Sequence, residues 1–219
     1  RLGIKPLFVH GSDEGLVWAS ELAAVLESGI DVAVDPRSVY RYFSFRYTPQ
    51  PDTLVESVRK LPPGHSLTVR GGQTAQRRYW SLDQTPTDAS VDELADRVRD
   101  HLEASVRKRL MGDVPVGAFL SGGLDSSAVV GLMTREVDDV RTYSIGFEDD
   151  SVDESAEARF VAEEFGTDHT EARVDLDSME TFGRVVERFG EPLSDPASLP
   201  TLLLADRASE DLKVVLTGE

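Results

Sequence analysis

The sequence has 219 residues, of which 40% are hydrophobic, so it can bury the cores of one large domain or two modest ones. Its formal net charge of −17 argues against nucleic acid as a partner, since nucleic acid phosphates would be repelled. The lack of cysteine excludes disulfides and thiolate metal sites, and no apolar run approaches the length of a membrane span.

The first third of the chain has the pattern of short strands separated by turns. Two apolar runs flank a polar, glycine-containing turn, which predicts a hairpin, and Gly71-Gly72 predicts a second one. Strands are expected at 7–10, at 16–19, at 66–69 and in a run that ends at 79–80, and a short helix is expected at 20–26. The polar, proline-containing segment 81–90 is typical of a linker.

The rest of the chain alternates strands with helices. Ser90 and Glu93 form a predicted capping box, and apolar residues at helical spacing follow it as far as Val106. A second capping box is expected at 151–154. Further helices are expected at 179–189 and 201–208, and strands at 115–120, 140–147, 169–174 and 212–217. This alternation predicts an α/β fold, a parallel sheet with helices on both faces.

Residues 121–127, Ser-Gly-Gly-Leu-Asp-Ser-Ser, join a predicted strand to a predicted helix, and we call them the glycine loop. Adjacent glycines tolerate positive φ and let a ligand approach the backbone, while N–H groups and a helix N-terminus converge there. Such a loop predicts a phosphate site. It lacks the lysine of a Walker loop, the glycine spacing of a Rossmann fingerprint and the Gly-x-Ser-x-Gly of a hydrolase elbow. The alternative interpretation is a plain turn with a capping serine.

Asp125 is the one acid of the glycine loop. A carboxylate beside a polyphosphate is repulsive unless a hard divalent cation lies between them. Magnesium usually binds one or two carboxylates together with substrate phosphates. We therefore predict that Asp125 is a magnesium ligand.

The glycine loop resembles the pyrophosphate loop of the glutamine-dependent asparagine synthetases, and so does its lead-in at 113–117. Residues 215–219, Val-Leu-Thr-Gly-Glu, resemble the second nucleotide segment of that family. The segments that resemble the end of the family's glutaminase domain are 1–7, 19–22 and 59–64. The likeness covers essentially the whole chain, and the glycine loop is its most specific part.

The resemblance implies three parts in the chain. Residues 1–80 would be the β-rich remnant of an Ntn-type glutaminase (class II amidotransferase) domain, 81–90 a linker, and 91–219 the beginning of a synthetase domain of the adenine nucleotide alpha hydrolase type. The glutaminase nucleophile of the family is a cysteine, and this sequence has none. We therefore expect an internal fragment of a longer protein, with incomplete activity by itself.

The chemistry implied by the resemblance is ATP-dependent asparagine synthesis. Aspartate would be activated with ATP and Mg²⁺ to β-aspartyl-AMP, and ammonia from glutamine would displace AMP. The expected partners are these small molecules, with no nucleic acid and no membrane, in a cytoplasmic protein that we expect to form a homodimer.

The resemblance also assigns roles to individual residues. Asp125 would hold Mg²⁺, Glu219 would support adenylate formation as the catalytic residue, and the remaining residues would contact the nucleotide: Leu120, Ser121, Gly122, Gly123, Ser126, Ser127, Ile145, Thr217 and Gly218. For Leu120 and Ile145, core packing is the alternative interpretation.

Three further acids have two interpretations each. Asp153 lies near the site in the family but is also explained as a helix cap, and Glu191 and Asp195 could bind a substrate amine or form a turn. The histidines at 10, 65, 101 and 169 have no metal-ligand spacing, so we expect structural or surface roles. Other readings of the whole chain remain: another adenylating amidotransferase such as a β-lactam synthetase-like enzyme, a tRNA-modifying enzyme, which the acidic charge disfavours, or a non-catalytic nucleotide-binding fragment.

Overall fold

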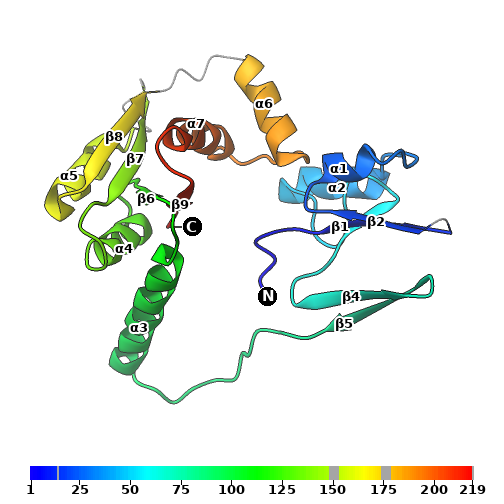
Figure 1. The fold of residues 1–219 in the computed structure, drawn as a ribbon, viewed down its shortest axis with the longest axis horizontal. Coiled ribbons are helices and arrows are strands. Elements are labelled where there is room, and N and C mark those ends of the chain that lie inside the picture. The colour runs from blue at the N-terminus through cyan, green and yellow to red at the C-terminus, as the bar shows by residue number, and fades with distance from the viewer. Residues whose placement is uncertain (14, 148–152, 174–178, 219) are drawn as a thin grey trace. The chain divides into compact units, whose positions relative to one another are not determined.

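The computed structural model describes residues 1–13, 15–147, 153–173 and 179–218 (Figure 1). The chain divides into two compact units. Arg1–Pro86 with Met179–Ser198 form one, which we call the N-terminal unit, and Thr87–Ser178 with Leu199–Glu219 form the other, the sheet unit. The segment 79–90 carries neither helix nor strand.

The N-terminal unit is built on antiparallel strands, as predicted. A three-stranded sheet has the order β2-β1-β3, and a separate hairpin follows it. These strands are β1 (Phe8–Ser12), β2 (Gly15–Ala19), β3 (Val58–Lys60), β4 (His65–Arg70) and β5 (Gln73–Arg78). The short helix α1 (Leu22–Leu26) buries Leu22 and Val25 against Phe8 and Val58, which forms a small core.

Two more helices belong to the N-terminal unit. Helix α2 (Pro36–Phe45) was not among the predicted elements, and helix α6 (Met179–Phe189) has the predicted bounds. Asp35 caps α2, because its carboxylate accepts hydrogen bonds from the N–H of Arg37 at 3.0 Å and the hydroxyl of Ser38 at 2.8 Å. Proline in the first turn adds a φ that suits a helix start.

The sheet unit contains the predicted parallel sheet. Its four strands have the order β8-β7-β6-β9, and every neighbouring pair is parallel. The strands are β6 (Val116–Phe119), β7 (Arg141–Gly146), β8 (Asp168–Arg173) and β9 (Val214–Leu216). The helices are α3 (Val91–Leu110), α4 (Leu124–Met133), α5 (Ser155–Phe165) and α7 (Ser198–Ser209). None of the described helices in either unit is both long and apolar enough to span a bilayer.

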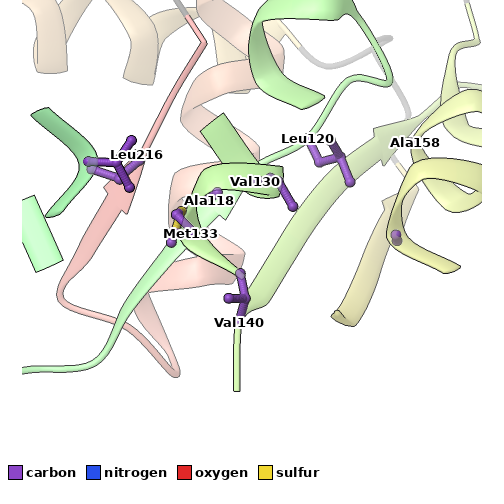
Figure 2. Packing of buried hydrophobic residues seen from close by; sticks show 9 residues of the cluster. Ala118, Leu120, Val130, Met133, Val140, Ala158 and Leu216 are labelled. Carbon is purple, nitrogen blue, oxygen red and sulfur yellow. The ribbon is translucent and has the colours of Figure 1, made fainter. Parts of the chain in front are cut away.

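Helices cover both faces of this sheet, which confirms the predicted α/β layering. On one face, residues of α3, α4 and α5 pack with Ala118 of β6 and Leu216 of β9 in a single core cluster (Figure 2). On the other face, α7 packs on Tyr143, Phe119 and Val215. Neighbouring residues such as Ala118 and Phe119 belong to opposite clusters because successive side chains of a strand point to opposite faces.

The two predicted capping boxes have different outcomes. The first is confirmed, since the hydroxyl of Ser90 accepts from the N–H of Glu93 and the carboxylate of Glu93 accepts from the N–H of Ser90. The prediction of a box at 151–154 was wrong, because α5 begins at Ser155. The carboxylate of Asp153 accepts hydrogen bonds from the N–H and hydroxyl of Ser155, which holds these residues in a turn before the helix.

Tyr143 offers a test of the face covered by α7. The residue is 1% exposed, and its hydroxyl donates to the carboxylate of Asp211 at 3.0 Å. Replacing Tyr143 with phenylalanine keeps the ring packing and removes one hydrogen bond to a carboxylate, so we expect the sheet unit to lose about 1 kcal/mol of unfolding free energy. Faster hydrogen exchange in α7 measures the loss. Tyr40→Phe is the control, because the side chain of Tyr40 is 75% exposed; equal exchange in both variants would contradict the prediction.

Candidate active site

The glycine loop leaves β6 and turns the chain into α4. Leu120 extends the strand, because its N–H donates to the carbonyl of Tyr143 at 2.8 Å. The backbone then turns at Gly122, where φ is +77°, and α4 begins after Gly123, its N-cap. A β-carbon on Gly122 would lie 2.7 Å from the carbonyl carbon of Glu157 on α5. Glycine is therefore required both for the turn and for the close approach of α5.

The three serine hydroxyls of the loop bond to the loop itself. The hydroxyl of Ser126 accepts from the N–H of Ser121 at 3.3 Å and donates to the carbonyl of Gly123 at 3.2 Å. The hydroxyl of Ser127 donates to the same carbonyl at 2.7 Å, and the hydroxyl of Ser121 accepts from the N–H of Gly123 at 3.3 Å. Within the described ranges no side chain caps α4. The N–H groups of its first turn and the positive end of its dipole can therefore receive an anion.

The end of β9 lies against the start of α4. A β-carbon on Gly218 would lie 2.7 Å from the carbonyl carbon of Asp125, so the two backbones are in contact. Thr217, beside it, is exposed. From β6 the chain adds β7 and then β8 on one side, and it returns to place β9 on the other side of β6. The strand order therefore reverses between β6 and β9. Such a topological switch point is the usual position of a ligand in a parallel sheet. Glu219, the predicted catalytic residue, lies outside the described residues.

The predicted magnesium ligand Asp125 is exposed in the first turn of α4. In the part of the chain that the structure describes, no three acidic or histidine side chains gather in a way that could hold a metal ion. A cation bound by Asp125 would therefore take its remaining ligands from water and from the substrate. Magnesium commonly binds in this way, with one or two carboxylates, several waters and substrate phosphates, so this single exposed carboxylate fits it.

The two residues expected near adenine lie at strand ends. Leu120 follows β6 and its side chain, 2% exposed, packs in the core with Val130, while Ile145 in β7 is half-buried. Core packing therefore accounts for the Leu120 side chain, and its backbone is the part left for a ligand. A nucleotide role for these two residues stays a prediction.

Two carboxylates flank the carboxyl-terminal end of β7, and the sequence pattern drew attention to only one of them. A β-carbon on Gly146 would lie 3.2 Å from Glu171 Oε1 and 3.6 Å from Asp153 Oδ1. The hydrogen bond from the N–H of Ser155 is the main cause that lowers the pKa of Asp153. Glu171, on β8, pairs with Arg159 of α5 at 2.5 Å. No sequence signal marked Glu171, because a single charged residue on a strand is typical of an exposed edge.

His169 lies under α5 among hydroxyl groups. Its Nδ1 is 2.8 Å from the hydroxyl of Thr142 and its Nε2 is 3.0 Å from the hydroxyl of Ser144. Burial lowers the pKa of His169 from its ordinary value of 6.5 and outweighs the opposing effect of Glu171. Because the folded-state pKa is below the unfolded value, protonation favours unfolding. Its stabilising contribution is present above pH 6.5 and is lost as the pH falls through the lowered pKa.

We therefore expect the sheet unit to lose stability between pH 7 and pH 5, and His169→Gln to reduce that loss. Urea midpoints from far-ultraviolet circular dichroism at pH 7, 6 and 5 would show it. The matched control is His101→Gln, because His101 is exposed on α3. Parallel pH profiles for wild type and His169→Gln would contradict the expectation.

The other predicted candidates lie in the N-terminal unit or outside the site. Glu191 forms an ion pair with Lys60. The carboxylate of Asp195 accepts from the N–H of Ala197 at 2.9 Å, which is turn chemistry. Ring nitrogens of His10 and His65 lie near backbone carbonyls, consistent with structural roles.

Curated relatives match the chain over nearly its whole length. It is 32% identical to asparagine synthetase [glutamine-hydrolyzing] 1 of Bacillus subtilis, over 99% of this chain and 35% of that protein. It is 35% identical to a putative asparagine synthetase [glutamine-hydrolyzing] of Mycobacterium tuberculosis, again over 99% of this chain and 35% of that protein. It is 32% identical to amidase chry2 of Gibberella zeae, over 100% of this chain and 36% of that protein. The chain thus spans about a third of the length of these relatives.

Family models agree with the relatives. The model of a glutamine amidotransferase domain matches residues 1–80, and the asparagine synthase model matches residues 97–219, which include the glycine loop, the parallel sheet and the end of β9. The chain is a member of the asparagine synthase family.

Proposed function

We propose that the protein that carries this chain is an ATP-dependent ligase that makes asparagine from aspartate through β-aspartyl-AMP, with ammonia derived from glutamine. The glycine loop, Thr217 and Gly218 would hold the nucleotide phosphates, and the backbones of Leu120 and Ile145 would frame adenine. The proposal rests above all on the packing of Gly218 against Asp125, which joins the two expected nucleotide segments at the switch point of the sheet.

The chain's own residues would contribute mainly by positioning and charge. The uncapped first turn of α4 would place N–H groups and the helix dipole where negative charge develops on departing pyrophosphate. The internal hydrogen bonds of Ser121 and Ser126 would keep this arrangement rigid before substrate binds. Magnesium, held by Asp125, would neutralise phosphate charge. Glu219 would support adenylate formation.

The relatives support this reaction class and leave the amide acceptor open. Two of those described above carry the name asparagine synthetase, and a third, at the same 32% identity as the Bacillus protein, is named an amidase. A second candidate function is therefore amide formation on an acceptor other than aspartate, by the same adenylating core. The two candidates differ in the product and share the ATP chemistry.

The test is product analysis with the protein supplied with Mg-ATP, aspartate and glutamine. We expect asparagine, AMP and pyrophosphate in equal amounts, and exchange of labelled pyrophosphate into ATP only when aspartate is present. Ammonium chloride in place of glutamine should support the same products. Formation of ADP and phosphate would overturn the adenylate mechanism. Pyrophosphate exchange that another carboxylic acid supports and aspartate does not would favour another acceptor.

A further inference from the structure

We propose that Glu171 is a positioning residue that holds the carboxyl-terminal end of β7 and thereby sets the affinity of the site for the base of the nucleotide. The inference rests on the proposed function, because it assigns the β7 end to the adenine side of the site. Residues of α5 and β8, which lie outside the glycine loop and the end of β9, would then also affect nucleotide binding.

The Glu171 carboxylate connects three elements of the sheet unit. Its side chain is 19% exposed, and Oε2 lies 2.5 Å from Nη2 of Arg159 on α5. Its other oxygen is 3.6 Å from Nε of Arg173 and would be 3.2 Å from a β-carbon on Gly146. Because Gly146 is buried, the carboxylate rests on the backbone of β7 where any larger residue would crowd it. Glu171 thus connects α5 and β8 to the end of β7.

A second carboxylate approaches the same backbone. Asp153 Oδ1 accepts from the N–H of Phe147 at 3.4 Å and would lie 3.6 Å from the β-carbon on Gly146. Asp153 and Glu171 are therefore neighbours with the same charge, and Arg159 is attracted to both of them. Without Arg159 the two carboxylates would repel each other across the strand end. The position of residues 145–147 therefore depends on this charge balance as well as on strand pairing.

The β7 end adjoins the glycine loop in the sheet. β7 is the parallel neighbour of β6, and the N–H of Leu120 donates to the carbonyl of Tyr143 in β7. A base bound on the backbone at the ends of these two strands would contact β7, whereas phosphates would contact α4 and Gly218. Loosening the β7 end should therefore weaken binding of the base and leave phosphate binding intact. A comparison of the affinities for ATP and for triphosphate therefore tests the role of Glu171 separately from phosphate binding.

The experiment measures the affinity of the protein for two probes, Mg-ATP and inorganic triphosphate with magnesium. In Glu171→Gln and Arg159→Gln we expect Mg-ATP to bind about fivefold more weakly, the scale of losing one partly exposed ion pair, with triphosphate affinity unchanged. Arg159→Lys should restore most of the ATP affinity. Hydrogen exchange in the peptide that covers Ile145 and Gly146 should be faster in Glu171→Gln, and wild-type exchange elsewhere shows that the variant is folded.

The matched control is Glu136→Gln, which removes an ion pair with Arg107 at 2.9 Å in the same unit, on residues that precede the start of β7 in the chain. It should bind both probes as the wild type does. Unchanged ATP affinity in Glu171→Gln, or an equal loss for ATP and triphosphate, would overturn the inference while the proposed function stands. If the wild-type protein bound neither Mg-ATP nor triphosphate, the proposed function would be overturned, and the inference with it.

Discussion

Replacing Gly122 with alanine is expected to lower the unfolding free energy of the sheet unit by about 2–5 kcal/mol. Two costs add at this position. A non-glycine residue at φ +77° costs about 1–2 kcal/mol, and a β-carbon 2.7 Å from the carbonyl carbon of Glu157 forces α5 away, an overpacking cost of about 1–3 kcal/mol. The glycine loop should also lose its nucleotide-binding shape.

Two other glycines of the same unit separate these costs. Gly166 has φ +66° with no neighbouring atom within 4 Å of a β-carbon, so Gly166→Ala should show the strain alone, about 1–2 kcal/mol. Gly123 has φ −68°, and a β-carbon there would meet only the Ser121 hydroxyl at 3.2 Å, so Gly123→Ala should cost less than about 1 kcal/mol.

The positions of the two tryptophans make this series measurable. Both Trp18 and Trp80 lie in the N-terminal unit, so tryptophan fluorescence reports urea unfolding of that unit, and hydrogen exchange in α4 and β6 reports the sheet unit. We expect the fluorescence transition to stay in place in all three variants. Equal hydrogen-exchange rates in Gly122→Ala and Gly166→Ala would show that α5 moves away from the new β-carbon with no loss of stability. That result would contradict the expected overpacking at Gly122.

The strand–loop–helix segment was predictable because several local signals agree there. The apolar run before Ser121, two adjacent glycines and the apolar residues after Ser127 each indicate the same arrangement. The sequence also predicted that the glycine loop and Gly218 follow the carboxyl ends of strands. Their direct contact depends on the pairing of β6 with β9, which the sequence pattern did not predict. Helix α3 was predicted equally well, since its capping box precedes a long helical period.

The elements that were missed are short or bury few residues. Helix α2 carries aromatic residues at helical spacing, yet it exposes Tyr40 and Phe43 and buries only Ser38 among its described residues. The local signal for its start is Asp35 followed by proline, with the aspartate as the N-cap and the proline in the first turn. Strand β3 has three residues, too few for any period.

Within the candidate site, the sequence did not predict the bonds that the side chains make. The loop serines were expected to contact phosphate, yet all three hydroxyls bond within the loop, and the helix N–H groups remain for an anion. A hydroxyl offers donor and acceptor to any neighbour, so sequence alone does not decide its partner. Glu171 was missed for a related reason, because its role depends on Arg159 and Gly146, which come from two other elements.

Replacing Asp125 with alanine is expected to weaken Mg-ATP binding by about tenfold or more, the scale on which metal sites respond to loss of a supporting group. The opposite effect is expected when magnesium is removed with EDTA. Wild-type Asp125 then presents an uncompensated carboxylate to the polyphosphate, and the alanine variant does not, so free ATP should bind the variant at least as tightly as it binds the wild type. Isothermal titration with and without magnesium measures both affinities.

Asp92 supplies the matched control, because it is also an exposed acid in the first turn of a helix of the sheet unit. Asp92→Asn changes the net charge of the unit by the same amount and should leave both affinities unchanged. Asp125→Asn separates charge from side-chain size, and we expect it to resemble alanine, since a neutral amide is a weaker magnesium ligand than a carboxylate. If the affinity for Mg-ATP in Asp125→Ala equals that of the wild type, magnesium is not held at this position. If affinity falls equally with and without magnesium, Asp125 acts through the shape of the loop instead of through a metal.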